Sequence, residues 1–180
     1  MIVKMKLKML KYYKLLTLLI LLFVLQSCFS VKYSFTGASI SPEVKTVSIQ
    51  DFRNVAPLIK PTLSIDITEA LKDRFVSQTN LQLMNYTGDL NFEGQITGYN
   101  IKPIAIKGGE NSVASLNRLT ITIKVKFSNT KDPSQDFEST FSRYADFPST
   151  ENFNSVQDGL AEEITEQLID DIFNKSVANW

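Results

Sequence analysis

The chain has 180 residues, in which 19 basic residues balance 19 acidic ones, and it contains one cysteine and no histidine. A single cysteine excludes an intramolecular disulfide, and the lack of histidine removes the commonest general base and transition-metal ligand. The balanced charge provides no basic excess of the kind that nucleic-acid-binding proteins use.

The N-terminus has the three-part pattern of an export signal. Residues 1–14 carry five lysines and no acid, residues 15–25 are an uncharged run rich in leucine, and Ser27 precedes the only cysteine, Cys28. The apolar run has 11 residues, whereas a membrane-spanning helix needs about 20. The pattern therefore predicts a signal peptide. A buried apolar helix, and a signal in which Cys28 is incidental, are the alternatives.

The end of this segment, Leu25-Gln26-Ser27-Cys28, resembles the lipobox of bacterial lipoproteins. The resemblance implies cleavage between Ser27 and Cys28, with a diacylglycerol and a fatty acid such as palmitate carried covalently by Cys28. We expect a signal peptide over residues 1–27, a tether over 28–42 and a single domain over 43–180. Removing the signal leaves 14 basic against 19 acidic residues. Residues 29–32 lack an acidic cluster, which favours a periplasm-facing anchor.

The remaining segments alternate between strand and helix patterns. Residues 44–52 predict a strand, 53–61 a loop, 62–78 a helix with an apolar residue at every fourth position, and 81–84 a brief strand. Residues 90–104 predict a strand with a bulge near Gly98, because the apolar phase shifts there. Residues 107–115 predict a polar loop, 118–128 and 135–147 two further strands, and 155–177 a long amphipathic helix.

This order predicts an α+β fold. One-faced strands need an apolar cover, and the two helices can supply it. We therefore expect a two-layer α/β sandwich with a mixed sheet of four to five strands, the last three forming an antiparallel meander, and both helices on one face. The acidic pairs on the last helix, Glu162-Glu163 and Asp170-Asp171, indicate a solvated surface.

No motif in the sequence supports catalysis. There is no nucleophile-elbow pattern and no phosphate-binding loop, and we expect neither an enzyme nor a metal or small-molecule cofactor. The candidate binding site is a basic row on the polar side of the strand over 118–128, formed by Arg118, Lys124 and Lys126. Such a row is typical of a solvated sheet face, but it could also bind anionic lipid head groups or a partner.

The chain as a whole resembles the LptE family of lipopolysaccharide-assembly lipoproteins. The resemblance is carried by residues 33–37, 90–94, 96–99, 117–120, 141–144 and 173–180. It implies an outer-membrane lipoprotein that plugs the LptD barrel, helps to assemble it, and takes part in lipopolysaccharide transport to the cell surface. It further implies that Arg118, Lys124 and Lys126 contact lipopolysaccharide. The alternative is another non-catalytic binding or scaffold lipoprotein of the cell envelope.

Overall fold

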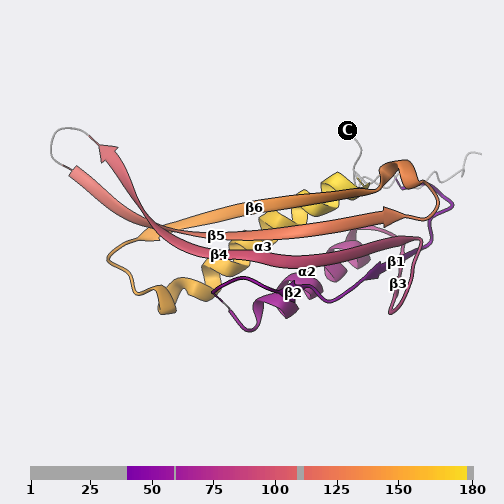
Figure 1. Ribbon diagram of the computed structural model, residues 1–180, viewed down its shortest axis with the longest axis horizontal. Coiled ribbons are helices and arrows are strands. Elements are labelled where there is room, and N and C mark those ends of the chain that lie inside the picture. Colours follow the sequence, from indigo (N-terminus) through magenta and orange to yellow (C-terminus); the bar gives the residue numbers. More distant parts are fainter. Residues whose placement is uncertain (1–39, 59, 109–111, 178–180) are drawn as a thin grey trace, which may run out of the picture. The chain divides into compact units, whose positions relative to one another are not determined.

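The computed structural model describes residues 40–58, 60–108 and 112–177. Its centre is a mixed sheet in the order β3-β1-β4-β5-β6 (Figure 1). The strands are β1 (Thr46–Ile49), β2 (Arg53–Asn54), β3 (Gln82–Met84), β4 (Leu90–Gly108), β5 (Ser112–Asn129) and β6 (Phe137–Pro148). The short β2 pairs with β4 further along the same side as β1. Counting β1 and β2 as one position beside β4, the sheet is five strands wide, within the predicted four to five.

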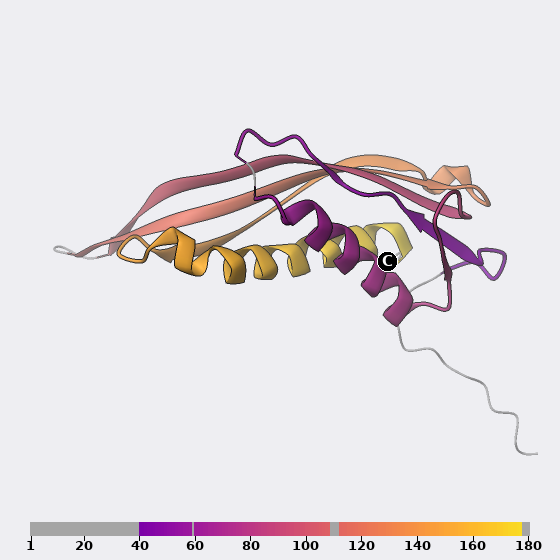
Figure 2. The ribbon, with the colours of Figure 1, turned by 90° about the horizontal axis from the view of Figure 1, so that it is seen from below.

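Both helices lie on one face of the sheet, which confirms the two-layer sandwich (Figure 2). They are α2 (Leu63–Gln78) and α3 (Phe153–Val177). The Phe75 ring of α2 lies 5.0 Å from Phe92 of β4 and 5.1 Å from Phe173 of α3, measured between ring centroids. The core therefore joins both helices to the central strand. No helix in the described part of the chain has the length and apolar character needed to cross a membrane.

The last three strands form the predicted antiparallel meander. On β5 the inward side chains Leu119, Ile121, Ile123, Val125 and Phe127 are fully or almost fully buried, and the polar residues between them point away from the helices. Strict alternation therefore identified the two faces of this strand. The bulge is also confirmed, because the register of β4 against β5 shifts between Ile96 and Gly98.

The strands β4 and β5 extend beyond the predicted ends. The segment 107–115 is not a simple polar loop, since pairing continues from Ile104 and Leu116 to Gly108 and Ser112. These positions lie beyond Pro148, where the pairing of β6 with β5 ends. Backbone pairing continues through this two-stranded ribbon, which the apolar pattern of the sequence does not reveal.

A glycine allows an aromatic ring to lie against β4. Phe52, between β1 and β2, is fully buried, and a Cβ placed on Gly94 would come within 3.0 Å of its ring. Only a residue without a side chain leaves that space free. Gly94 therefore fixes how closely the segment from β1 to β2 approaches the central strand.

One carboxylate joins the starts of β1 and β4. Asp89 accepts hydrogen bonds from the Lys45 and Thr46 backbone N–H groups at 2.9 and 3.1 Å, and Lys131 Nζ lies 3.1 Å from its other oxygen. The Lys45 N–H first, and then Lys131, lower the pKa of Asp89 to about 2. The parallel pairing of β1 with β4 thus begins at an anchored carboxylate.

The acidic pair Asp170-Asp171 is not simply solvated, contrary to the prediction. Asp170 forms an ion pair with Arg74 of α2, and Asp171 forms a two-pronged pair with Arg143 of β6 at 2.5 and 2.6 Å. The two neighbouring carboxylates point to different partners, and so they tie α3 to α2 on one side and to β6 on the other.

Candidate functional site

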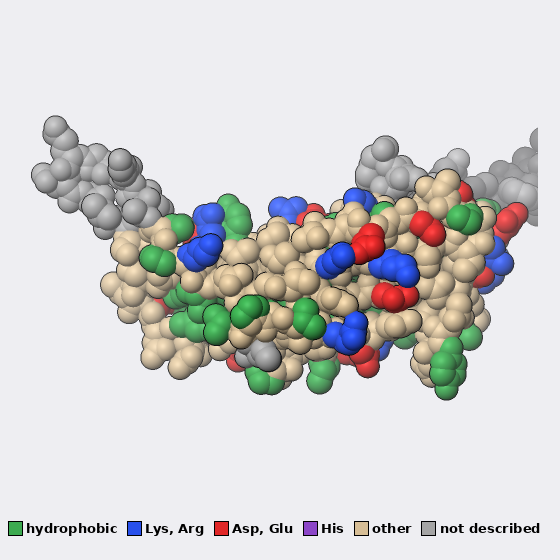
Figure 3. Space-filling view, in the orientation of Figure 1, with side chains coloured by type: hydrophobic (Ala, Val, Ile, Leu, Met, Phe, Trp, Pro, Cys, Tyr) green, Lys and Arg blue, Asp and Glu red, His purple; other side chains and the backbone are tan. Residues whose placement is uncertain are grey.

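The candidate site lies on the sheet face opposite the helices. Alternation along β5 places the side chains of Arg118, Lys124 and Lys126 on this face. Lys and Arg side chains lie next to Asp and Glu side chains across it (Figure 3). The basic row predicted from sequence is therefore present, but it is interleaved with acids from the neighbouring strands.

Arg118 is already engaged by β6. Its Nε and one terminal nitrogen donate to the two carboxylate oxygens of Asp146 at 2.7 and 2.8 Å, and its guanidinium lies 3.5 Å from the centroid of the Tyr144 ring. This pairing raises the pKa of Arg118 and lowers that of Asp146. Two of its five N–H donors are bonded to Asp146 and one face of the guanidinium is covered by Tyr144, so its charge is already offset and it attracts another anion less strongly.

Lys124 and Lys126 lie together some distance from Arg118. Lys124 comes six positions after Arg118 along an extended strand, a distance of about 20 Å. Lys124 pairs with Glu138 of β6, and this ammonium lowers the pKa of Glu138. The Nζ of Lys126 lies 3.7 Å from a carboxylate oxygen of Glu93 on β4, too far for a hydrogen bond. These two lysines therefore form a site without Arg118.

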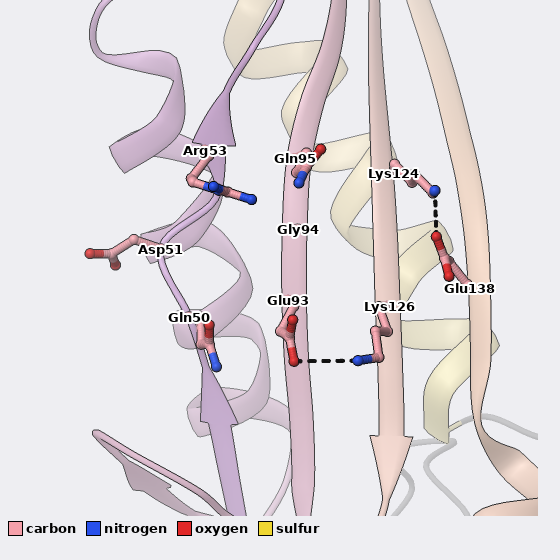
Figure 4. Close-up of a pocket in the computed structure, with 9 residues that line it drawn as sticks. All are labelled: Gln50, Asp51, Arg53, Glu93, Gly94, Gln95, Lys124, Lys126 and Glu138. Carbon is pink, nitrogen blue, oxygen red and sulfur yellow. Dashed lines mark ion pairs between the residues drawn. The ribbon is translucent and has the colours of Figure 1, made fainter.

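The two lysines line an open cavity of about 270 Å³ (Figure 4). Arg53 of β2 also lines it, and its side chain extends toward β4. Within the described residues no carboxylate oxygen lies within 4.0 Å of the Arg53 guanidinium. The remaining lining residues are Gln50, Asp51, Glu93, Gly94, Gln95, Glu138. The cavity thus presents three cations and the carboxylates of Glu93 and Glu138, whereas the carboxylate of Asp51 points away from β4 and lies 3.7 Å from Lys72 Nζ. Arg53 is the least neutralised of the three cations.

This arrangement suits the binding of a polar, phosphate-bearing or sugar-bearing group better than it suits catalysis. The reason is that charged donors and acceptors alternate around an open cavity. Separately, no group of three or more His, Cys, Asp or Glu residues in the described part of the chain could hold a metal ion. Sequence reasoning missed Arg53, which lies in a segment predicted to be a loop. Its only sequence signal is a basic residue directly after the strand pattern of β1.

The predicted lipidation site lies elsewhere in the chain. Ser27 and Cys28 fall outside the described residues, as does the whole signal segment over 1–27. The tether over 28–42 is described only from residue 40 onward.

Comparison with known proteins identifies a family. The family model described as LptE, lipopolysaccharide-assembly, matches residues 44–176. A comparison with curated proteins gives no match.

Several solved structures are similar to this chain at low sequence identity. A neuraminyllactose-binding hemagglutinin homolog from Helicobacter pylori is 8% identical, with a TM-score of 0.51, over 79% of this chain and 88% of that one. A minor lipoprotein from Acinetobacter baumannii is 14% identical, with a TM-score of 0.48, over 74% of this chain and 92% of that one. A hypothetical protein from Chlamydia trachomatis is 8% identical, with a TM-score of 0.49, over 76% and 99%.

Proposed function

Because this chain belongs to the LptE lipopolysaccharide-assembly family, we propose that it acts as the plug and assembly partner of an LptD-type outer-membrane barrel. The family works in lipopolysaccharide assembly and is not catalytic. The match of the family model to residues 44–176, nearly the whole described domain, is the observation that carries the proposal.

The exposed sheet face supports a role inside a polar barrel. The interior of large membrane barrels is polar and water-filled. A plug in such a space needs a hydrophilic surface whose charges are balanced, and the outer face pairs Arg118 with Asp146, Lys124 with Glu138, and Lys126 loosely with Glu93.

The test is recovery of the barrel from cells. The intact lipoprotein, affinity-tagged at its C-terminus, is purified from detergent-solubilised outer membranes, and co-purifying proteins are identified by mass spectrometry. We expect a large β-barrel protein in a fixed ratio to the tagged chain. Recovery of a different envelope protein, with no barrel, would favour the alternative of another scaffold or binding lipoprotein.

We propose further that lipopolysaccharide contacts the basic row, chiefly through Lys124 and Lys126. Arg53 joins them at the cavity, whereas the guanidinium of Arg118 is occupied by Asp146 and contributes less. A phosphate group entering the cavity would compete with Glu138 for Lys124 and could pair directly with Arg53. The net effect is a site of modest affinity that discriminates by geometry as well as by charge.

Charge reversal tests this site. Lys124→Glu combined with Lys126→Glu should strongly reduce lipopolysaccharide binding while the fold, checked by circular dichroism, is kept. The matched control is Lys45→Glu with Lys175→Glu, which changes the net charge equally at two exposed positions outside the cavity and away from Arg118. Equal binding by both double variants and the parent would show that the face is merely solvated.

We propose finally that Cys28 anchors the protein to the outer membrane, facing the periplasm. The signal over 1–27 would be removed before Cys28, and the tether over 28–42 would connect the lipid to the single domain over 43–180. Two or more acyl chains hold a protein stably at a membrane. Cys28→Ala should abolish incorporation of labelled palmitate, and unchanged labelling of this variant would refute the assignment.

A further inference from the structure

A second polar site lies among the helices, on the opposite side of the sheet from the basic row. It is a groove of about 400 Å³ between α2 and α3. The lining residues are Lys60, Asp66, Ala70, Asp158, Ala161, Glu162, Thr165 and Glu166. Two alanines, one from each helix, leave room between the helices, and four carboxylates surround that space.

The carboxylates of α3 form a regular row. Asp158, Glu162, Glu166 and Asp170 recur at every fourth position, which places them on one side of the helix about 6 Å apart. Like charges at this spacing destabilise a helix unless cations offset them. The stability of α3 therefore depends on which cations lie opposite this row of carboxylates.

The two ends of the row already have cations, and both come from the α2 side. Lys60 Nζ lies 3.3 Å from a carboxylate oxygen of Asp158 and 3.3 Å from one of Asp66, and its side chain is only 13% exposed. Arg74 pairs with Asp170. In the described residues no Lys or Arg nitrogen lies within 4.0 Å of the carboxylate oxygens of Glu162 or Glu166. The groove thus accommodates one cation at Lys60 and leaves the middle of the row unneutralised.

A buried hydroxyl in the same groove also lacks a partner. Thr165 lines the groove, is only 6% exposed, and its hydroxyl oxygen forms no hydrogen bond. An unsatisfied buried polar group is costly, and such groups are normally paired in native proteins. This observation is independent of the carboxylates, and it leaves the hydroxyl available to pair with a ligand group in the groove.

We propose that this groove docks a basic segment of the barrel partner, whose Lys or Arg side chains pair with Glu162 and Glu166. The inference rests on the proposed function, since the partner barrel supplies the segment. The aliphatic stem of a long cationic side chain would pack on Ala70 and Ala161, and its head group would reach the carboxylates and donate to the Thr165 hydroxyl. Within the described residues no cluster suited to a metal ion is present, which favours a protein side chain over a bare cation.

Recovery of the barrel with charge-reversed variants tests this docking. Glu162→Lys combined with Glu166→Lys should reduce the recovered barrel at least about tenfold, as expected for reversed charges at an interface. The control, Glu151→Lys with Glu163→Lys, makes the same change in net charge at two exposed positions outside the groove and should recover the barrel as the parent does. Equal recovery by both double variants would overturn the proposal.

A direct probe separates this inference from the proposed function. Tetralysine peptide is titrated into the full mature chain, and the backbone amide resonances of α3 are followed by NMR. Shifts centred on Glu162 and Glu166 support the groove even if no barrel is recovered, in which case only the proposed function fails. Recovery of the barrel, without shifts and without an effect of the double variant, overturns the groove alone.

Thr165→Val provides a second, less disruptive variant. Because it removes an unsatisfied hydroxyl without changing the shape of the side chain much, the free chain should unfold at the same or a higher temperature. If the hydroxyl accepts from the incoming cation, tetralysine should bind several-fold more weakly to this folded variant. Unchanged binding would remove Thr165 from the site.

Discussion

The contact between Gly94 and Phe52 makes a prediction whose sign is opposite to the usual expectation. Alanine is normally favoured over glycine inside a strand by roughly 0.5–1 kcal/mol. Here the added Cβ would come within 3.0 Å of a ring that is fully buried. Overpacking of a filled core costs about 1–3 kcal/mol, which exceeds the propensity gain. Gly94→Ala should therefore lower the free energy of unfolding.

The magnitude can be isolated with a double-mutant cycle. Phe52→Ala alone should cost about 3–5 kcal/mol, as for other fully buried phenylalanines. With the ring removed, the Cβ at position 94 has space, so the double variant should be less destabilised than the sum of the single variants by at least about 1 kcal/mol. Urea unfolding followed by circular dichroism measures all four corners of the cycle.

Gly159 offers a matched control. It lies in α3, and no atom lies within 4 Å of the position that an added Cβ would take, so Gly159→Ala should stabilise the protein by roughly 0.5–1 kcal/mol. The two Gly→Ala changes should therefore have opposite signs. If Gly94→Ala also stabilised the protein, or if its effect were additive with Phe52→Ala, the steric reasoning would be refuted.

Three further predictions concern the anchors of the fold. The pKa of Asp89 is lowered to about 2, whereas an unfolded aspartate titrates near about 3.9, so the stabilisation that Asp89 provides is present above about pH 4 and is lost as the pH falls toward 2. Asp89→Asn should therefore lower the free energy of unfolding at pH 7 and make it less dependent on pH between about 4 and 2. An unchanged dependence of stability on pH in this variant would argue against the role of Asp89. Asp171→Ala should lower the free energy of unfolding only modestly, because its ion pair with Arg143 is partly exposed. A double-mutant cycle with Arg143→Ala should give a measurable coupling energy in low salt, whereas zero coupling would contradict the clamp of α3 to β6. Phe75→Ala should lower the free energy of unfolding by about 3–5 kcal/mol, measured by thermal or urea unfolding, because the ring contacts both the sheet and α3. A loss below about 1 kcal/mol would show that the helices pack independently of this ring.

The sequence predicts the layers well because they depend on local periodicity. The alternation along β5 and the four-residue apolar spacing of α2 each require only the residues of one element. The bulge near Gly98 is predicted for the same reason, since a phase shift is visible within a single strand. The parallel pairing of β1 with β3 and β4 is not local, and nothing in the short segments of β1 and β3 specifies their neighbours.

The candidate site was harder to predict because charge pairing depends on register. Lys126 lies opposite Glu93 on β4 and Glu138 on β6 only in the observed alignment of the strands. The alternation of β5 shows which side chains leave the core, but not which acids from other strands they meet. The same limit explains Asp171, whose partner Arg143 lies 28 positions earlier in the chain.

The neutralised outer face and the open acidic groove differ in how they should respond to ionic strength. Added salt screens exposed charges over a Debye length of about 8 Å at physiological concentration. A surface on which cations and anions already alternate presents little long-range field, so its docking against a polar barrel wall should be nearly indifferent to salt, unlike direct phosphate contacts at Lys124, Lys126 and Arg53. The unneutralised carboxylates on the helical side project a field that attracts cations in dilute buffer and fades in concentrated salt. Docking through the outer sheet face would thus tolerate salt, whereas cation binding in the acidic groove would weaken as salt is added.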